Sequence, residues 1–378
     1  MKKIVFNRAS FVGKELKYIS EAIQNAHISG NGPFTERAEM LLEEILDHPS
    51  KVLLTTSCTH ALEMAAILLD LKPGDEVIVP SYTFVTSALA FHMHGAKIVF
   101  SDIKPETLTL DEKLLQKLVT EKTRAIIPVH YGGVSCEMDQ ILDIATKNNI
   151  IVIEDNAHGL FGKYKGKNLG TLGHMATQSF HETKNVSCGE GGALVINDTS
   201  YVERAEIIRE KGTDRSKFFR GQIDKYSWTD RGSSYVMSDL LAACLCAQLL
   251  ESEMIQEKRS ERWEFYNSNL KGWAKENSVD LPSVPEYCEH PSHLFYLLMP
   301  SESTRNALIN FLKENDIQAV FHYLPLNSSP MAKKIGSNGR EMPVTENVSK
   351  RLLRLPLYLD LDMKEMSYIV EKIKEFKT

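Results

Sequence analysis

The stretch KVLLTTSCTHALEMAAILLDLKPGDEVIVP, residues 51–80, contains the pattern that decides the fold. KVLLTT, residues 51–56, is a short apolar run typical of a strand, and the apolar residues of THALEMAAILLDL recur at helical spacing. DEVIVP, residues 75–80, is a second short apolar run. Strands that alternate with helices in this way are typical of an α/β protein, in which helices cover both faces of a parallel sheet.

The same alternation continues downstream. Helices are expected at 83–94 and 137–148, and strands at AKIVFSDI (96–103), RAIIPVHY (124–131) and NIIVIED (149–155). After residue 172 the pattern changes, because MATQSFH (175–181) and GALVIND (192–198) read as strands with no long helix between them. These two strands are antiparallel neighbours or a hairpin-like pair.

The C-terminal third predicts a smaller α+β domain. Residues 238–270 are helical in pattern and increasingly charged, so we interpret them as the arm that joins two domains. Strands are expected at HLFYLLMP (293–300) and IQAVFHYLP (317–325), and helices at 303–315 and from Met363. We therefore expect a large domain over residues 1–250 and a small domain over 251–378.

Composition limits the classes of function. A formal net charge of −6 argues against wholesale nucleic-acid binding. The six cysteines are scattered without metal spacing, which favours a reduced, cytoplasmic protein and no metal site. MKKIVFNRAS at the start has no long apolar run, so no signal peptide is expected, and no segment approaches the roughly 20 apolar residues of a membrane span.

Candidate chemistry begins at the end of IIVIED. Ligands of parallel sheets bind beyond the carboxyl ends of the strands, so Asp155 should point into a crevice and Glu154 to the opposite side. Asp155 alone is equally consistent with a cap on the following turn. Two further features point to a site: the start of SCTHAL, residues 57–62, offers N–H groups to a phosphate, and Lys184 precedes a glycine-rich turn.

Pyridoxal phosphate has groups that match all three features: a phosphate, a basic ring nitrogen and an aldehyde. An ionised Asp155 would keep the ring nitrogen protonated, which makes the ring a better electron sink. Lys184 would join the aldehyde as a Schiff base while neutral, and once released it would move a proton at the substrate carbon. A nicotinamide-binding Rossmann fold is excluded because no G-x-G-x-x-G follows the first strand.

The order of SCTHALEMA, PSYTFVTSA, VIEDNAHG and SFHETKNVSCGEGG resembles the DegT/DnrJ/EryC1/StrS sugar aminotransferases over nearly the whole chain. That resemblance implies the pyridoxal-phosphate transferase fold type I of aspartate aminotransferase. It also implies a mostly parallel seven-stranded sheet and a smaller C-terminal α+β domain. By position, the resemblance gives cofactor roles to Lys184 (Schiff base), Asp155 (ring nitrogen), His158 (3-oxygen), Phe84 (ring stacking), and Cys58, Thr59 and Ser179 (phosphate).

One position departs from the family pattern. Many relatives have G-x-N-Y-R ahead of the linker helix, with the asparagine reaching the phosphate of the neighbouring subunit. This chain has Gly232, Ser233, Ser234, Tyr235 and Val236 there. Ser234 can still donate one hydrogen bond, whereas Val236 removes the arginine's charge.

Substrate contacts are less specific. The segment at residues 209–226, REKGTDRSKFFRGQIDKY, is either a solvated loop or part of the mouth of the site. Within it we select Arg220, Lys225 and Tyr226 as candidate contacts to the nucleotide sugar. By resemblance, His322 and Tyr323 border the sugar, and the N-terminal loop 28–36 closes over substrate.

The resemblance implies transfer of an amino group from L-glutamate to C4 of dTDP-4-keto-6-deoxyglucose, giving dTDP-4-amino-4,6-dideoxygalactose, in a homodimer with shared active sites. The gluco epimer and amination at C3 remain open, because no spacing in the sequence fixes the face of the sugar. A pyridoxamine-dependent sugar dehydratase is disfavoured because such enzymes have histidine in place of Lys184. A non-catalytic cofactor-binding regulator is disfavoured because no DNA-binding segment is appended.

Overall fold

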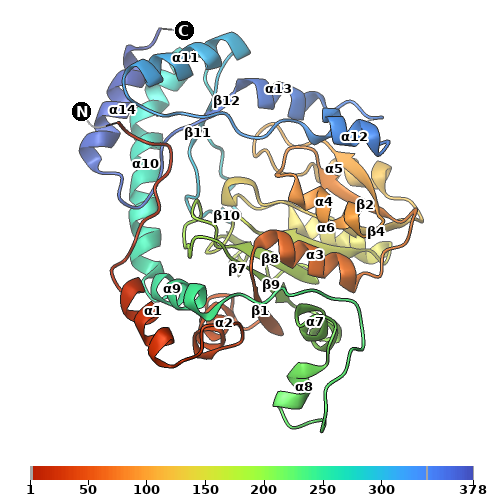
Figure 1. Ribbon diagram of the computed structural model, residues 1–378. Coiled ribbons are helices and arrows are strands. Elements are labelled where there is room, and N and C mark those ends of the chain that lie inside the picture. Colours follow the sequence, from red (N-terminus) through yellow and green to blue (C-terminus); the bar gives the residue numbers. More distant parts are fainter. Residues whose placement is uncertain (1–2, 338, 378) are drawn as a thin grey trace.

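The structure is a computed structural model that describes residues 3–337 and 339–377. Its centre is a seven-stranded sheet in the order β1-β9-β8-β5-β4-β2-β3 (Figure 1). The strands are β1 (Lys51–Thr55), β2 (Glu76–Pro80), β3 (Lys97–Ser101), β4 (Thr123–Ile126), β5 (Ile151–Asp155), β8 (Met175–Ser179) and β9 (Gly192–Ile196). Only β9 is reversed, since it is antiparallel to both β8 and β1. The predicted mostly parallel sheet is therefore confirmed, and β8 and β9 are the antiparallel neighbours.

Both faces of this sheet are buried, which explains its nearly continuous apolar strands. Along β2, Val77 and Val79 face helices α3 (Cys58–Leu68), α4 (Thr86–Met93) and α7 (Val202–Arg209).

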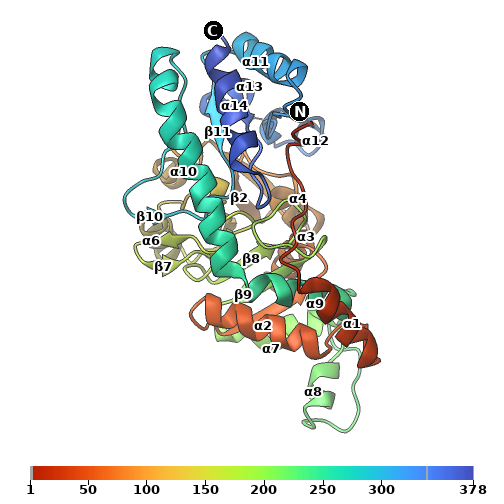
Figure 2. The same ribbon diagram turned by 90° about the vertical axis from the view of Figure 1, so that its left-hand side faces the viewer.

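The alternate residue of β2, Ile78, faces the other side of the sheet, where α5 (Glu112–Leu118) and α6 (Met138–Lys147) pack. At the β1 end of that side, α2 (Pro33–Ile45) and α9 (Asp239–Leu249) cover the sheet. Helix α1 (Glu15–Gln24) packs beside α9 (Figures 1 and 2).

The C-terminal part has its own apolar core. Helix α10 (Ser252–Glu276) runs along this part, as Figure 2 shows, and contributes Trp263 and Tyr266 to that core. Helices α11 (Glu302–Glu314) and α14 (Met363–Glu375) complete the core around a two-stranded sheet. The remaining elements are β6 (Lys163–Tyr164), β7 (Lys167–Asn168), β10 (Cys288–Glu289), β11 (Tyr296–Leu298), β12 (Leu352–Arg354), α8 (Arg215–Phe219), α12 (Pro330–Lys334), α13 (Pro343–Arg351) and three short 3-10 turns (Tyr131–Gly133, Thr199–Tyr201, Leu326–Ser328).

The helical pattern expected over residues 238–270 corresponds to two helices, α9 and α10, which are separated by a break at 250–251. The strand expected at IQAVFHYLP was wrong, because this segment makes only isolated bridges, from Ile317 to Ile4 and from Val320 to Arg354. Its apolar pattern reflects side chains that turn toward the core and a pocket, and Pro325 has no N–H to donate to a ladder. Within the described ranges, no helix is both long enough and apolar enough to cross a membrane.

The contact between β9 and the start of α3 is unusually close. A Cβ atom built on Gly192 would lie 2.3 Å from the Cys58 nitrogen and 2.4 Å from the Ser57 carbonyl carbon. Both atoms belong to the backbone, so neither can move aside as a side-chain end does. Only glycine therefore allows the strand and the helix start to approach this closely.

Gly192→Ala should lower the free energy of unfolding by about 1–3 kcal/mol or more, because overpacking here displaces backbone. Gly272→Ala is the matched control: it lies inside α10 with open space around its Cβ position, and we expect it to raise stability by up to about 1 kcal/mol. Guanidinium unfolding of both variants tests this pair. Equal midpoints for the two variants would contradict the close-contact reading.

Candidate active site

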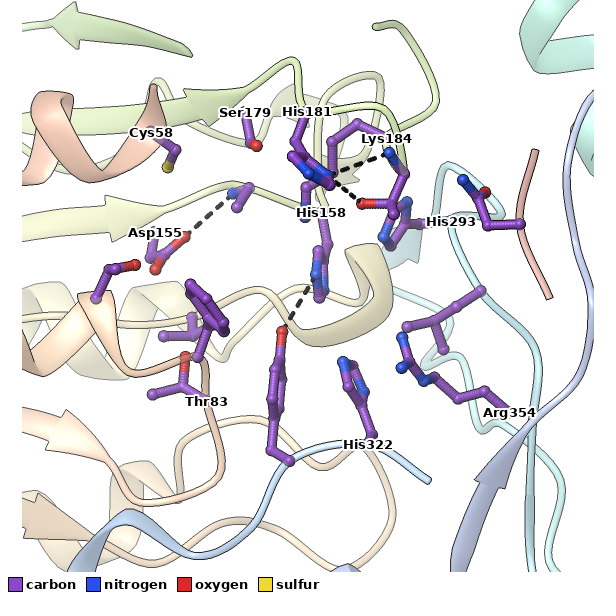
Figure 3. Close-up of a pocket in the computed structure, with 18 of the residues that line it drawn as sticks. Cys58, Thr83, Asp155, His158, Ser179, His181, Lys184, His293, His322 and Arg354 are labelled. Carbon is purple, nitrogen blue, oxygen red and sulfur yellow. Dashed lines mark hydrogen bonds between the residues drawn. The ribbon is translucent and has the colours of Figure 1, made fainter. Parts of the chain in front are cut away.

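A cavity of about 620 Å³ lies at the carboxyl ends of the sheet strands, where residues of the C-terminal part also line it (Figure 3). Its polar and aromatic lining includes Cys58, Thr59, Thr83, Phe84, Asp155, His158, Ser179, His181, Lys184, Glu190, His293, His322, Tyr323 and Arg354. These side chains come from segments spread over almost the whole sequence, and the sheet brings them together.

Asp155 ends β5 and points into this cavity. Its carboxylate accepts hydrogen bonds from the Ser87 hydroxyl at 2.6 Å and from the Ala157 backbone N–H at 3.2 Å. The side chain is buried, so these two donors replace hydrogen bonds to water. Each donor binds a different oxygen of the carboxylate.

Glu154 faces the opposite side of the sheet, as its position in the strand predicts. It accepts backbone N–H bonds from Gly170, Leu172 and Gly173 at 2.8–2.9 Å. His130 lies 2.9 Å from its carboxylate. The His130 Nδ1 atom accepts the backbone N–H of residue 136, so the ring proton is on Nε2 and is donated to Glu154.

Lys184 lies on the tight loop between β8 and β9. Its backbone N–H donates to the carbonyl of His181 at 2.9 Å, and the loop closes at Gly189, where φ is +92°. Inside the cavity, burial lowers the pKa of the Lys184 amine to about 8, although Asp155 favours the charged form. The neutral amine that a nucleophile requires is thus far more populated near physiological pH than in an ordinary lysine, although the charged form still predominates.

The start of α3 forms the opposite end of the cavity. The Ser57 side chain caps the helix by accepting the His60 N–H at 3.1 Å, so Ser57 is a capping residue. Cys58 and Thr59 then present the first N–H groups of the helix at the cavity, opposite Ser179 at the end of β8. A helix start of this kind binds phosphate well.

The three features fit pyridoxal phosphate. A lysine with a lowered pKa, the carboxyl group of Asp155 and a helix start suited to an anion lie around one cavity. Figure 3 shows Cys58 and Ser179 toward one end of this cavity, Asp155 beside them and Lys184 farther along. Among the described residues, no group of three or more His, Cys, Asp or Glu side chains is placed to hold a metal ion.

Two stacked histidines have protonation states that the geometry fixes. The Gly132 N–H donates to His158 Nδ1 at 3.2 Å, so the proton of His158 is on Nε2, which lies 3.4 Å from the Tyr323 hydroxyl. The amide of Asn185 donates to the Pro291 carbonyl at 2.7 Å, so its oxygen accepts from Nδ1 of the second ring, His293, at 2.9 Å.

The Nε2 atom of His293 is therefore an acceptor. Burial holds the pKa of both His158 and His293 well below the usual value, and both rings are neutral. Their centroids are 4.3 Å apart.

Nine of the residues selected from the sequence line the cavity: Lys184, Asp155, His158, Phe84, Cys58, Thr59, Ser179, His322 and Tyr323. The structure does not bring Ser234, Arg220, Lys225 or Tyr226 to it. The backbone of Ser234 forms an isolated antiparallel β-bridge with the backbone of Glu210. Arg220 pairs with Glu206 at 2.8 Å, and the α8 segment extends away from the body (Figure 1).

The loop 28–36 is also absent from the cavity lining of its own chain. The N–H groups of Phe34 and Thr35 donate to the carboxylate of Asp239, which anchors the start of α2 against α9. Sequence reasoning missed other residues. Ser87 lies inside PSYTFVTSA, and His293 begins HLFYLLMP, so position in a motif was a usable signal for both. Arg354, at the end of a three-residue strand, gave no such signal.

Fold and site together define a pyridoxal-phosphate-dependent aminotransferase with the aspartate aminotransferase type of fold. The model of the DegT/DnrJ/EryC1/StrS aminotransferase family matches residues 10–374. The chain belongs to that family.

Relatives of this chain include two enzymes named for nucleotide-linked amino sugars and a protein named as a pleiotropic regulator. The chain is 30% identical to GDP-perosamine synthase of Escherichia coli O157:H7, covering 100% of this chain and 99% of that protein. It is 29% identical to UDP-4-amino-4-deoxy-L-arabinose–oxoglutarate aminotransferase of Shewanella sediminis, covering 96% and 95%.

Among solved structures, the PLP form of Spr1654 from Streptococcus pneumoniae matches with a TM-score of 0.91 and 26% identity, over 99% of this chain and 98% of that one. DesV of S. venezuelae matches with a TM-score of 0.89 and 27% identity, over 99% and 98%. The cofactor is pyridoxal phosphate.

The pKa of Lys184 predicts the pH dependence of cofactor uptake. Because the neutral amine reacts, the rate at which the apoenzyme takes up pyridoxal phosphate should rise with pH through a midpoint of about 8. Stopped-flow absorbance measures this rate. Pyridoxamine phosphate, which has no aldehyde, is the control and should show no such rise; a midpoint above pH 10 for the aldehyde would contradict the lowered pKa.

Ser87→Ala should weaken retention of the cofactor by up to about 10-fold, since a typical hydrogen bond contributes about 0.5–1.5 kcal/mol. Ser20→Ala, on the exposed surface of α1, is the matched control. Dissociation constants from equilibrium dialysis test the pair, and an unchanged constant for Ser87→Ala would show that the Ala157 N–H alone orients Asp155.

Proposed function

We propose that this chain transfers an amino group from L-glutamate to C4 of dTDP-4-keto-6-deoxyglucose and makes dTDP-4-amino-4,6-dideoxygalactose. The observation that carries the aminotransferase reaction is the convergence of Lys184 and Asp155 on one cavity. C4 and glutamate are supported by the name of one relative, which specifies a 4-amino sugar and oxoglutarate, the keto acid of glutamate. The dTDP group and the galacto configuration rest on the resemblance of longer sequence strings alone.

Each residue has a definite task in this reaction. Bound pyridoxal phosphate supplies a cationic ring that accepts the electron pair left when a proton leaves the substrate carbon. Asp155 holds the proton on the ring nitrogen, and the Lys184 amine carries the proton to and from the substrate carbon. The start of α3 holds the phosphate and so fixes the distance of the ring from Lys184.

Part of the cavity wall is polar but uncharged. Three neutral imidazoles lie in the lining, since burial keeps the pKa of His158, His293 and His322 well below the usual value. Burial likewise raises the pKa of the Tyr323 phenol, which also lines the cavity, above the usual value. Such walls offer hydrogen bonds to sugar hydroxyls without adding charge beside the reacting carbon.

The active enzyme is a homodimer with shared sites in this proposal. Phe84 lines the cavity, yet 56% of its surface is exposed, and Val85, Leu89 and Met93 extend the exposed apolar surface along α4. An apolar group beside a site entrance is typical of a protein interface. A second copy placed there can bring its own Ser234 to this cavity.

We infer two domains, 1–250 and 251–378, because the α9–α10 break falls at 250–251 and the C-terminal part has its own core. A cytoplasmic location fits the six free cysteines. A glucose-type product and amination at C3 remain the competing reactions within the same fold.

The purified holoenzyme, given L-glutamate and dTDP-4-keto-6-deoxyglucose, should release 2-oxoglutarate and an amino sugar whose C4 configuration is assigned by NMR. Lys184→Ala should lose product formation by about 10³-fold or more, whereas Lys117→Ala, exposed on α5, should not change it. Borohydride should fix a pyridoxyl group on Lys184. An intact rate in Lys184→Ala overturns the reaction; a C3-amino or gluco product overturns only the substrate assignment.

A further inference from the structure

Arg354 is a cationic group in the cavity that the proposed reaction has not yet used. It ends β12, where it pairs with Tyr296 of β11, and its backbone bridges Val320. The side chain lines the cavity. Figure 3 shows it at the other end from Cys58 and Asp155, next to His322.

The guanidinium of Arg354 has fewer partners than it can use. Its Nε atom is buried and makes no hydrogen bond with the described residues, and Nη2 donates to the Phe321 carbonyl at 3.1 Å. The ring of Phe6 lies 4.6 Å from Cζ and covers one side. Within residues 3–337 and 339–377, no carboxylate is found in an ion pair with Arg354, and none is among the groups that shift its pKa.

The Arg354 guanidinium therefore lacks a negatively charged partner in the described part of the chain. Burial lowers the pKa of the Arg354 guanidinium, and its close polar neighbours are the neutral phenols of Tyr131, Tyr323 and Tyr82. Buried charges in proteins are ordinarily paired, because an unpaired one loses its hydration without compensation. A ligand that brings a negative group to this end of the cavity would supply the missing partner.

The cofactor phosphate is not that group, because its site at Cys58, Thr59 and Ser179 is at the other end of the cavity. A sugar diphosphate is bulky, carries two negative groups and must leave its nucleoside room toward solvent. Phe6 and Tyr323 narrow the space around the one guanidinium here. A planar carboxylate fits the fork of an arginine in such a narrow space.

We propose that Arg354 binds a carboxylate of the amino-acid donor, in the same cavity that the keto sugar enters after the donor has left. This inference rests on the proposed aminotransferase function and adds the residue that selects the donor. Arg354 lines the same cavity as Lys184, so a donor carboxylate bound there places the donor's amine inside the reacting space.

Glutarate is the probe, since it has both carboxylates of glutamate and no amine to react. Calorimetric titration of the holoenzyme should give a dissociation constant that Arg354→Gln raises about 10- to 100-fold. Arg354→Lys, which keeps the charge without the planar fork, should raise it less. Arg351→Gln is the matched control, because Arg351 lies three residues earlier, donates to the Met299 carbonyl and is absent from the cavity lining.

The nucleotide amino sugar is titrated in parallel. Its affinity should stay within about threefold in all three variants, because it brings no carboxylate. Equal glutarate affinity in wild type and Arg354→Gln overturns the proposal, as does a loss confined to the nucleotide sugar. The absorbance of the bound cofactor reports whether each variant is folded. If Arg354→Gln loses its cofactor, the glutarate affinity of Arg354→Lys is compared with that of the wild type instead, and equal affinities overturn the proposal. Glutarate binding needs no turnover, so a wrong sugar assignment leaves this test intact.

Discussion

The free-energy cost of keeping an ammonium group out of water sets the chemistry of this molecule. Lys184 lies in a cavity whose walls lower the pKa of its amine to about 8. The carboxylate of Asp155 lines the same cavity and accepts hydrogen bonds from a hydroxyl and a backbone N–H. One fold thus supplies an amine of lowered pKa and a hydrogen-bonded carboxyl group in the same cavity.

The orientation of Asp155 toward the cavity depends on strand register. Asp155 pairs with Thr177 across β5 and β8, and Glu154 pairs with Ala176. A slip of one residue would turn Glu154 into the cavity and Asp155 away from it. Glu154 opposes such a slip, since three backbone N–H groups and His130 bind its carboxylate on the far side of the sheet.

The sequence predicted what local patterns encode. Apolar runs located the seven strands, and the order of motifs located Lys184 and Asp155. It did not predict contacts between distant segments. Arg354 has no local signature, and the ring states of His158 and His293 depend on Gly132 and Asn185, which only the fold brings near. The strand expected at 317–325 was wrong because apolar alternation does not reveal whether a partner strand is present.

The pairing of β1 bears on synthesis of the chain. In the sheet order β1 lies at the edge, and β9 is its one neighbour. Lys51–Thr55 therefore leaves the ribosome long before Gly192–Ile196, its pairing partner, has been made. During that interval the apolar VLLT segment has no native strand beside it, and exposed strands of this kind associate readily with other chains. A chaperone that covers this segment until β9 has been made would limit such association.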